Sequence, residues 1–105
     1  MLYMSFTAPH SPNEATEEDL ARFEGQPRQK YAAMMYALDR GVGKIVDELK
    51  AAGKFDNTII FFLSDNGGST TNQYSNLPLK GFKGNKFEGG QRVPFFVVWT
   101  NVSPG

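Results

Sequence analysis

The chain has 105 residues, in which 11 Lys and Arg balance 11 Asp and Glu, 40% of residues are hydrophobic and cysteine is absent. This composition is typical of a globular protein. The lack of cysteine excludes disulfides, thiol nucleophiles, zinc–thiolate sites and iron–sulfur clusters from these residues, and leaves the cellular compartment open. Because the formal net charge is zero and no apolar run approaches the roughly 18 residues of a membrane span, we expect neither nucleic acid nor a membrane as a partner.

The N-terminal half predicts a strand followed by an amphipathic helix. Residues 1–6 are mostly apolar and predict a strand, which ends at the Pro-rich turn that follows. Residues 13–24 contain five acidic residues and one basic residue, which indicates a solvated loop or a short surface helix beginning near Thr16. Residues 29–52 place apolar side chains at the spacing of a helix with one buried face, and Gly53 is suited to its C-terminal end.

The C-terminal half predicts further strands separated by a long loop. Residues 58–63 are apolar after Thr58, and a strand that is apolar on both faces is typical of a central parallel strand covered by helices. The order strand, helix, strand predicts a right-handed crossover. Residues 64–91 are rich in Gly, Ser, Thr and Asn without a helical period, which predicts a long loop that is either functional or disordered, and residues 93–99 predict another buried strand. The sequence therefore predicts an α/β fold.

Asp65 and Asn66 directly follow the predicted strand over residues 58–63, at the end of the strand where ligands bind in open parallel sheets. Their carboxylate and amide oxygens are hard ligands suited to calcium or magnesium, and the glycines at 67 and 68 would allow backbone to approach closely. Asp and Asn before Gly are also common turn formers, so the spacing leaves a metal site and a tight turn as alternatives.

A second group of candidate residues is cationic. Residues 80–92 carry four basic residues and one acidic residue among several glycines. Backbone N–H groups and the ammonium groups of lysines such as Lys83 are suited to hold an oxyanion, although the spacing differs from that of a P-loop, and a solvated basic loop is the alternative. His10 lies between two prolines at the end of the first predicted strand, where it is suited to donate a proton or contact an anion near neutral pH.

Four motifs cover nearly the whole chain in a defined order: Ala8–Pro12, Leu38–Ile45, Phe62–Gly68 and Lys83–Phe95. Their residues, order and spacing resemble those of the type I sulfatases, which belong to the alkaline-phosphatase-like superfamily. The resemblance implies an α/β fold that is part of an alkaline-phosphatase-like, mixed and mostly parallel sheet with covering helices. It also implies that residues 1–105 are the middle-to-C-terminal part of a sulfatase catalytic domain.

The resemblance implies a role for each candidate site residue. Asp65 and Asn66 correspond to calcium ligands of the family, and Lys83 and His10 correspond to residues that contact the sulfate. A sulfate monoester carries delocalised negative charge, and cleavage of its S–O bond adds charge to the leaving oxygen, so both cations are suited to stabilise that charge or to donate a proton. Calcium, the implied cofactor, would hold the sulfate ester substrate and the nucleophile together.

The chain departs from the family because it lacks the nucleophile. Family members form a formylglycine from Cys or Ser in a Cys/Ser-x-Pro-Ser-Arg motif, and neither that motif nor the paired N-terminal aspartates of the calcium site is present. We therefore expect a fragment that is inactive alone, binds calcium weakly and self-associates through exposed sheet edges, and whose parent hydrolyses sulfate esters. The alternatives are a phosphonate or phosphate ester hydrolase of the same superfamily and a non-catalytic anion-binding module.

Overall fold

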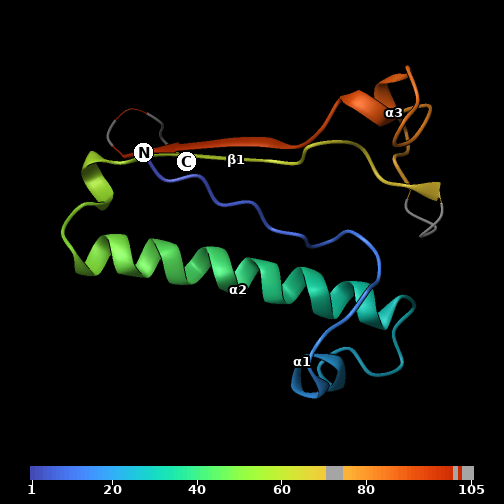
Figure 1. Cartoon of the computed structure of the whole chain (residues 1–105), viewed down its shortest axis with the longest axis horizontal. Helices are drawn as coiled ribbons and strands as arrows, with labels where there is room; N and C mark the ends of the chain where they lie inside the picture. The colour runs from blue at the N-terminus through green and yellow to red at the C-terminus, as the bar shows by residue number, and fades with distance from the viewer. Residues whose placement is uncertain (71–74, 101, 103–105) are drawn as a thin grey trace. The chain divides into compact units, whose positions relative to one another are not determined.

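The computed structural model describes residues 1–70, 75–100 and 102. The chain forms two compact units, Met1–Gly53 and Lys54–Gly105. In chain order the elements are α1 (Glu17–Ala21), α2 (Gln29–Ala51), η1 (Phe55–Asn57), β1 (Ile59–Leu63), α3 (Glu88–Gln91) and β2 (Phe95–Trp99) (Figure 1). Within the described ranges, no helix combines the length and the apolar character needed to cross a membrane.

Helices α1 and α2 begin and end close to where their capping residues predict. Thr16 is the N-cap of α1, and its Oγ1 accepts a hydrogen bond from the backbone N–H of Asp19 at 3.2 Å. Gly53 follows α2 with a φ of +63°, which glycine adopts without strain, and its N–H donates to the carbonyl oxygen of Lys50 at 3.0 Å. The predicted helix over residues 29–52 and the short helix after Thr16 are therefore confirmed.

The core of the first unit lies on one face of α2. Ala33, Met34 and Leu38 are its buried apolar residues, and they follow the helical spacing that predicted the buried face. Phe6, from the N-terminal segment, packs against α2 at Gly41, where a Cβ atom would lie 3.3 Å from the Phe6 ring. The absence of a side chain at Gly41 thus allows the segment to approach the helix closely.

Residues 1–6 are extended but do not form a strand, so the predicted first strand and its crossover are wrong. A strand requires a neighbouring strand to satisfy its backbone hydrogen bonds. In the described part of the chain, β1 and β2 pair with each other, and neither pairs with this segment. Phe6 of this segment packs on α2 at Gly41, whereas Met1, Leu2 and Tyr3 are largely exposed.

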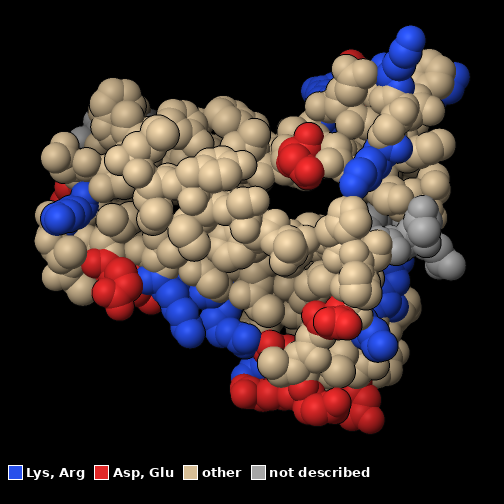
Figure 2. Space-filling view, viewed as in Figure 1, with Lys and Arg blue, Asp and Glu red and all other residues tan. Residues whose placement is uncertain are grey.

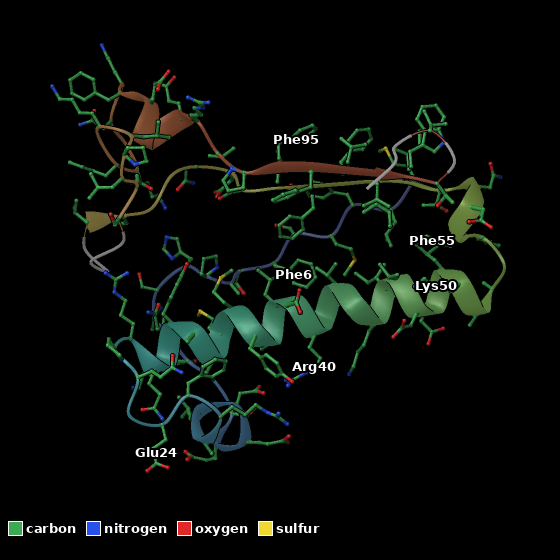
Figure 3. All side chains as sticks on the ribbon, turned by 180° about the vertical axis from the view of Figure 1, so that it is seen from behind. Phe6, Glu24, Arg40, Lys50, Phe55 and Phe95 are labelled. Carbon is green, nitrogen blue, oxygen red and sulfur yellow. The ribbon has the colours of Figure 1, made fainter. Side chains whose placement is uncertain are left out.

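The acidic segment is not entirely solvated, because Asp19 is buried with only 1% of its surface exposed. Its carboxylate accepts two hydrogen bonds from the guanidinium of Arg40, at 2.5 Å and 2.7 Å, and Arg40 extends from α2 toward α1 (Figure 3). These hydrogen bonds hold the pKa of Asp19 below its usual range against the opposing effect of burial. The remaining acidic side chains of α1 gather on the surface, as Figure 2 shows.

The lowered pKa of Asp19 predicts a loss of stability in acid. A carboxyl group whose pKa falls on folding stabilises the native state above its unfolded pKa, and this contribution disappears as the pH falls through the lowered value. We expect Asp19→Asn to lower the thermal midpoint at pH 7, and the difference from wild type to shrink below about pH 4. Thermal unfolding measured from pH 7 to pH 2 checks this. Glu18→Gln, which removes the exposed Glu18–Arg22 pair, is the control and should have little effect.

The second unit contains a two-stranded antiparallel sheet (Figure 1). Ile59 of β1 pairs with Trp99 of β2, and Leu63 pairs with Phe95 at the other end. Both strands lie where the sequence predicts them. The sequence predicts parallel pairing for β1, but among the described residues β1 pairs antiparallel with β2. An apolar pattern on both faces of a strand indicates that other layers bury both faces. It does not indicate whether the neighbouring strand runs parallel or antiparallel.

The strands are also more exposed than predicted. Phe61 is 61% exposed and Phe95 is 57% exposed, although their rings stack with centroids 6.1 Å apart. Two strands have too little surface to bury both faces of an apolar ribbon, which requires further layers. The expected self-association through these edges stays a prediction, which sedimentation velocity of the 105-residue chain would measure.

Candidate functional site

The turn that follows β1 presents the predicted metal ligands. The N–H of Ser64 donates to the carbonyl of Pro94 at 3.3 Å, and the Ser64 hydroxyl donates to the carbonyl of Asn66 at 2.8 Å. Asp65 is exposed and Asn66 is half-buried. Among the described residues, the Asp65 carboxylate has no hydrogen-bond or ion-pair partner, so its oxygens are available to a ligand.

Backbone hydrogen bonds connect this turn to residues 80–92, called the basic loop below. The N–H of Lys83 donates to the carbonyl of Gly68 at 3.0 Å, and the N–H of Gly67 donates to the carbonyl of Gly90 at 3.1 Å. The basic loop is closed on itself in the same way, because the N–H of Gly89 donates to the carbonyl of Lys80 at 2.8 Å. Segments that are separated in the sequence are therefore held together at the backbone.

Glycines make this contact sterically feasible. A Cβ atom on Gly67 would lie 1.8 Å from the carbonyl oxygen of Gly89, and a Cβ on Gly89 would lie 2.3 Å from the carbonyl oxygen of Gly81. Gly81 itself has a φ of +95°, in the region that favours glycine. The prediction that glycines after Asp65 allow close backbone approach is confirmed, and the partner backbone is that of the basic loop.

This packing predicts that Gly67→Ala separates the two loops. The new methyl group overlaps a backbone oxygen, which has no side-chain rotamer available to relieve the overlap, so we expect a loss of about 3 kcal/mol in the free energy of unfolding, near the upper end for overpacking. Chemical denaturation measures the change. Gly43→Ala is the matched control, because no described atom lies within 4 Å of that Cβ and alanine should stabilise α2 by about 1 kcal/mol. Equal effects of the two substitutions would contradict this explanation.

The cations of the basic loop differ in their surroundings. The Lys80 ammonium lies 4.2 Å from the centroid of the Phe87 ring, and the Arg92 guanidinium lies 3.6 Å from the Glu88 carboxylate. Lys83 is exposed, and its ammonium group has no partner among the described residues. Lys83 therefore combines a fixed backbone position with a free charge, which suits it to bind an oxyanion.

The turn offers the right chemistry for a calcium ion but an incomplete set of ligands. Asp65 and Asn66 present carboxylate and amide oxygens, which are hard donors of the kind that calcium prefers. Calcium requires about 6–8 oxygen ligands, and the described residues contain no group of three or more His, Cys, Asp or Glu side chains able to hold a metal. These two residues thus fit part of a calcium site, and such a site would need further ligands from other residues.

His10 belongs to the first unit, so the structure brings together only the other three predicted site residues, Asp65, Asn66 and Lys83. His10 is exposed after the Ala8–Pro9 bond, and its Nδ1 lies 2.7 Å from the carbonyl oxygen of Ser11. Its backbone N–H donates to the carbonyl of Thr7 at 2.8 Å, which fixes the turn. The imidazole Nε2 side remains accessible for a ligand.

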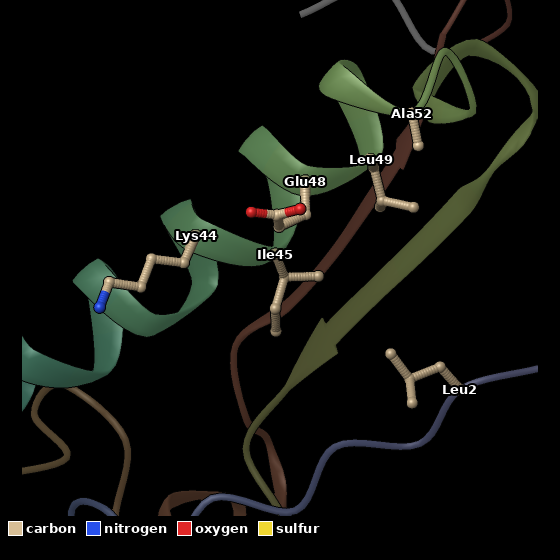
Figure 4. Close-up of a pocket in the computed structure, with 6 residues that line it drawn as sticks. All are labelled: Leu2, Lys44, Ile45, Glu48, Leu49 and Ala52. Carbon is tan, nitrogen blue, oxygen red and sulfur yellow. The ribbon is translucent and has the colours of Figure 1, made fainter.

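A surface groove in the first unit is separate from these residues. Its lining comes from the N-terminal segment, from α2 and from the C-cap of α2, as Figure 4 shows: Leu2, Lys44, Ile45, Glu48, Leu49 and Ala52. It has no nucleophile and none of the predicted site residues. The groove is therefore not part of the candidate site.

The comparison with protein families identifies the family to which the chain belongs. A model of the family described as Sulfatase matches residues 1–105, the whole chain. The chain belongs to the sulfatase family. Its sulfatase relatives include the uncharacterized sulfatase YdeN of Escherichia coli (strain K12), which is 39% identical over 100% of this chain and 20% of its own length. Arylsulfatase J of Mus musculus is 39% identical over 91% of this chain and 17% of its own.

Solved structures agree with the sulfatase assignment. The crystal structure of Ps i-CgsB superimposes with a TM-score of 0.86 at 47% identity, covering 94% of this chain and 23% of that one. The α/β, alkaline-phosphatase-like fold class expected from the sequence is thereby confirmed. The chain spans about a fifth of the length of the curated sulfatases that it matches.

One residue that connects the two loops of the candidate site could not be predicted from the sequence. Asn76 connects the two loops through side-chain hydrogen bonds to Gly68 and Gly81. Nothing in the local sequence distinguishes it from other polar residues of a long loop, because its partners lie five and eight positions away in the chain. Only the folded arrangement of the loops reveals its position.

Proposed function

We propose that this chain is the part of a sulfatase catalytic domain that supplies the sulfate-binding lysine and two ligands of a calcium ion, and that the protein containing it hydrolyses sulfate esters. The observation that carries this proposal is the hydrogen bond from the N–H of Lys83 to the carbonyl of Gly68 at 3.0 Å. This hydrogen bond holds Lys83 beside the turn that carries Asp65 and Asn66. Family membership over the whole chain supports the same reading.

In this proposal each residue acts on the sulfate group or its surroundings. Lys83 binds the sulfate oxygens and stabilises the charge that grows as the S–O bond breaks. His10 contacts the anion and donates a proton toward the leaving oxygen, a role suited to an imidazole near neutral pH. Asp65 and Asn66 would hold calcium, which when bound supplies positive charge that orients the sulfate.

The nucleophile is proposed to lie outside these residues. The formylglycine motif of type I sulfatases, Cys/Ser-x-Pro-Ser-Arg, does not occur in the 105 residues, and the chain spans about a fifth of its relatives. Residues 1–105 are accordingly proposed as a partial catalytic domain whose nucleophile-bearing portion is N-terminal to them. The chain alone would therefore not turn over a sulfate ester.

Side-by-side rates on an aryl sulfate and the matching aryl phosphate test the proposed function. The full-length protein that contains this chain should hydrolyse the sulfate faster, as its membership of the sulfatase family leads us to expect. Faster hydrolysis of the phosphate would instead favour a phosphate or phosphonate ester hydrolase of the same superfamily. Hydrolysis of neither ester, with retained binding of inorganic sulfate in isothermal titration, would favour a non-catalytic anion-binding module.

A further inference from the structure

Asn76 uses its side-chain amide to bridge the two loops of the candidate site. Its Oδ1 accepts a hydrogen bond from the N–H of Gly68 at 2.8 Å. Its Nδ2 donates to the carbonyl of Gly68 and to the carbonyl of Gly81, each at 3.1 Å. The acceptor and both donor hydrogens of the amide are thus engaged with backbone, on two different segments.

The contacts of Asn76 lie close to the residues proposed to act on the sulfate. Gly68 is three positions after Asp65, and its carbonyl oxygen also accepts the hydrogen bond from the N–H of Lys83 at 3.0 Å. Gly81 is two positions before Lys83, at a φ of +95° that sets the course of the loop. Asn76 therefore fixes Gly68 relative to Gly81, and with them the separation of Asp65 from Lys83.

We propose that Asn76 is a positioning residue, which sets the distance between the calcium-binding turn and the sulfate-binding lysine without touching either ligand. The inference rests on the proposed function, since it concerns the same two loops. Asparagine is suited to this task because it presents an acceptor and two donors from one short, planar group. Aspartate has the same shape but lacks both donors, and its second oxygen would face two carbonyl oxygens.

Asn76→Asp in the full-length sulfatase is the direct test. We expect kcat/KM for an aryl sulfate to fall by about 10- to 100-fold, the usual effect of removing a residue that orients a ligand-binding group. The dissociation constant of inorganic sulfate, measured by isothermal titration, should rise as well. A residue that only stabilised the fold would lower the thermal midpoint and leave sulfate affinity of the folded protein unchanged.

Asn85→Asp is the matched control. It adds the same charge to the same region, but the Asn85 Oδ1 only accepts a hydrogen bond, from the N–H of Phe87 at 3.1 Å, and a carboxylate accepts it equally well. We expect its sulfate affinity and kcat/KM to stay close to wild type. An equal loss in both variants would overturn the proposal, because added charge alone would then explain the effect.

Three further outcomes distinguish a failure to fold, a failure of the proposed function and a failure of the positioning role. If Asn76→Asp does not fold, Asn76→Gln keeps the hydrogen-bonding groups but displaces them by one methylene, and wild-type kcat/KM and sulfate affinity in that variant would overturn the positioning role. If the wild-type protein binds inorganic sulfate in an Asn76-dependent way but hydrolyses no sulfate ester, the proposed function fails and the positioning role stands. Wild-type affinity and kcat/KM in a folded Asn76→Asp protein would overturn the positioning role alone.

Discussion

Lys83→Ala in the full-length sulfatase is expected to lower kcat for an aryl sulfate by about 10²- to 10³-fold, the effect of removing one group that stabilises a developing oxyanion. Lys83 is the residue whose backbone is fixed to the turn after β1 and whose ammonium is unpaired among the described residues. Removal of its charge leaves the loop backbone unaltered. Steady-state kinetics with a chromogenic aryl sulfate measures the loss.

Lys86→Ala supplies the control for the Lys83 result. Lys86 lies three positions further along the same exposed loop, and its carbonyl still accepts the hydrogen bond from Gln91 after the side chain is shortened. We expect kcat to remain near the wild-type value. If both lysine variants lose activity equally, the role belongs to the general charge of the loop and not to Lys83.

Asp65→Ala is expected to remove calcium and activity together. Asp65 is the charged ligand offered by the turn, and its carboxylate has no competing partner in the part of the chain that the structure describes. Removal of a residue that hydrogen-bonds to a metal ligand weakens metal binding by up to about 100-fold. Removal of the ligand itself should weaken calcium binding by about 100-fold or more. Metal analysis after dialysis and activity against calcium concentration measure the two effects.

A control variant and a rescue experiment with added calcium complete the test of Asp65. Asp47→Ala removes an exposed carboxylate from α2 and should leave calcium content and kcat unchanged. Activity that returns to Asp65→Ala at high calcium concentration would support a ligand role, because excess metal compensates for weaker binding. Unchanged calcium content and activity in Asp65→Ala would remove Asp65 from the site.

The sequence predicted those features of the fold that depend on local interactions. The apolar spacing along residues 29–52 and the capping by Thr16 and Gly53 specify α1 and α2 without reference to the rest of the chain. The strands β1 and β2 were likewise located by their apolar runs. Strand pairing depends on partners remote in sequence, which explains why the direction of β1 against β2 and the absence of a strand over residues 1–6 were not predicted.

The site was predicted to a similar extent. Residue types and the family resemblance predict Asp65, Asn66 and Lys83 as candidate site residues, and the glycines indicate a close backbone approach, which Gly67 makes with Gly89. The sequence did not indicate that the basic loop is the partner in that approach, nor that Asn76 holds the two loops together. Both features follow from the three-dimensional course of the loops. The sequence of the acidic segment likewise predicts a solvated surface, because it does not reveal that Arg40 pairs with the buried carboxylate of Asp19.

The proposed function requires that this chain carries the anion- and calcium-binding side of a sulfatase site and that the nucleophile lies outside these 105 residues. The most direct test compares hydrolysis of an aryl sulfate by the full-length protein and by the purified 105-residue chain, under identical conditions with added calcium. We predict turnover by the full-length protein and none by the chain alone. Turnover by the 105-residue chain, lost on Lys83→Ala, would contradict the claim, because the chain would then possess a complete catalytic site.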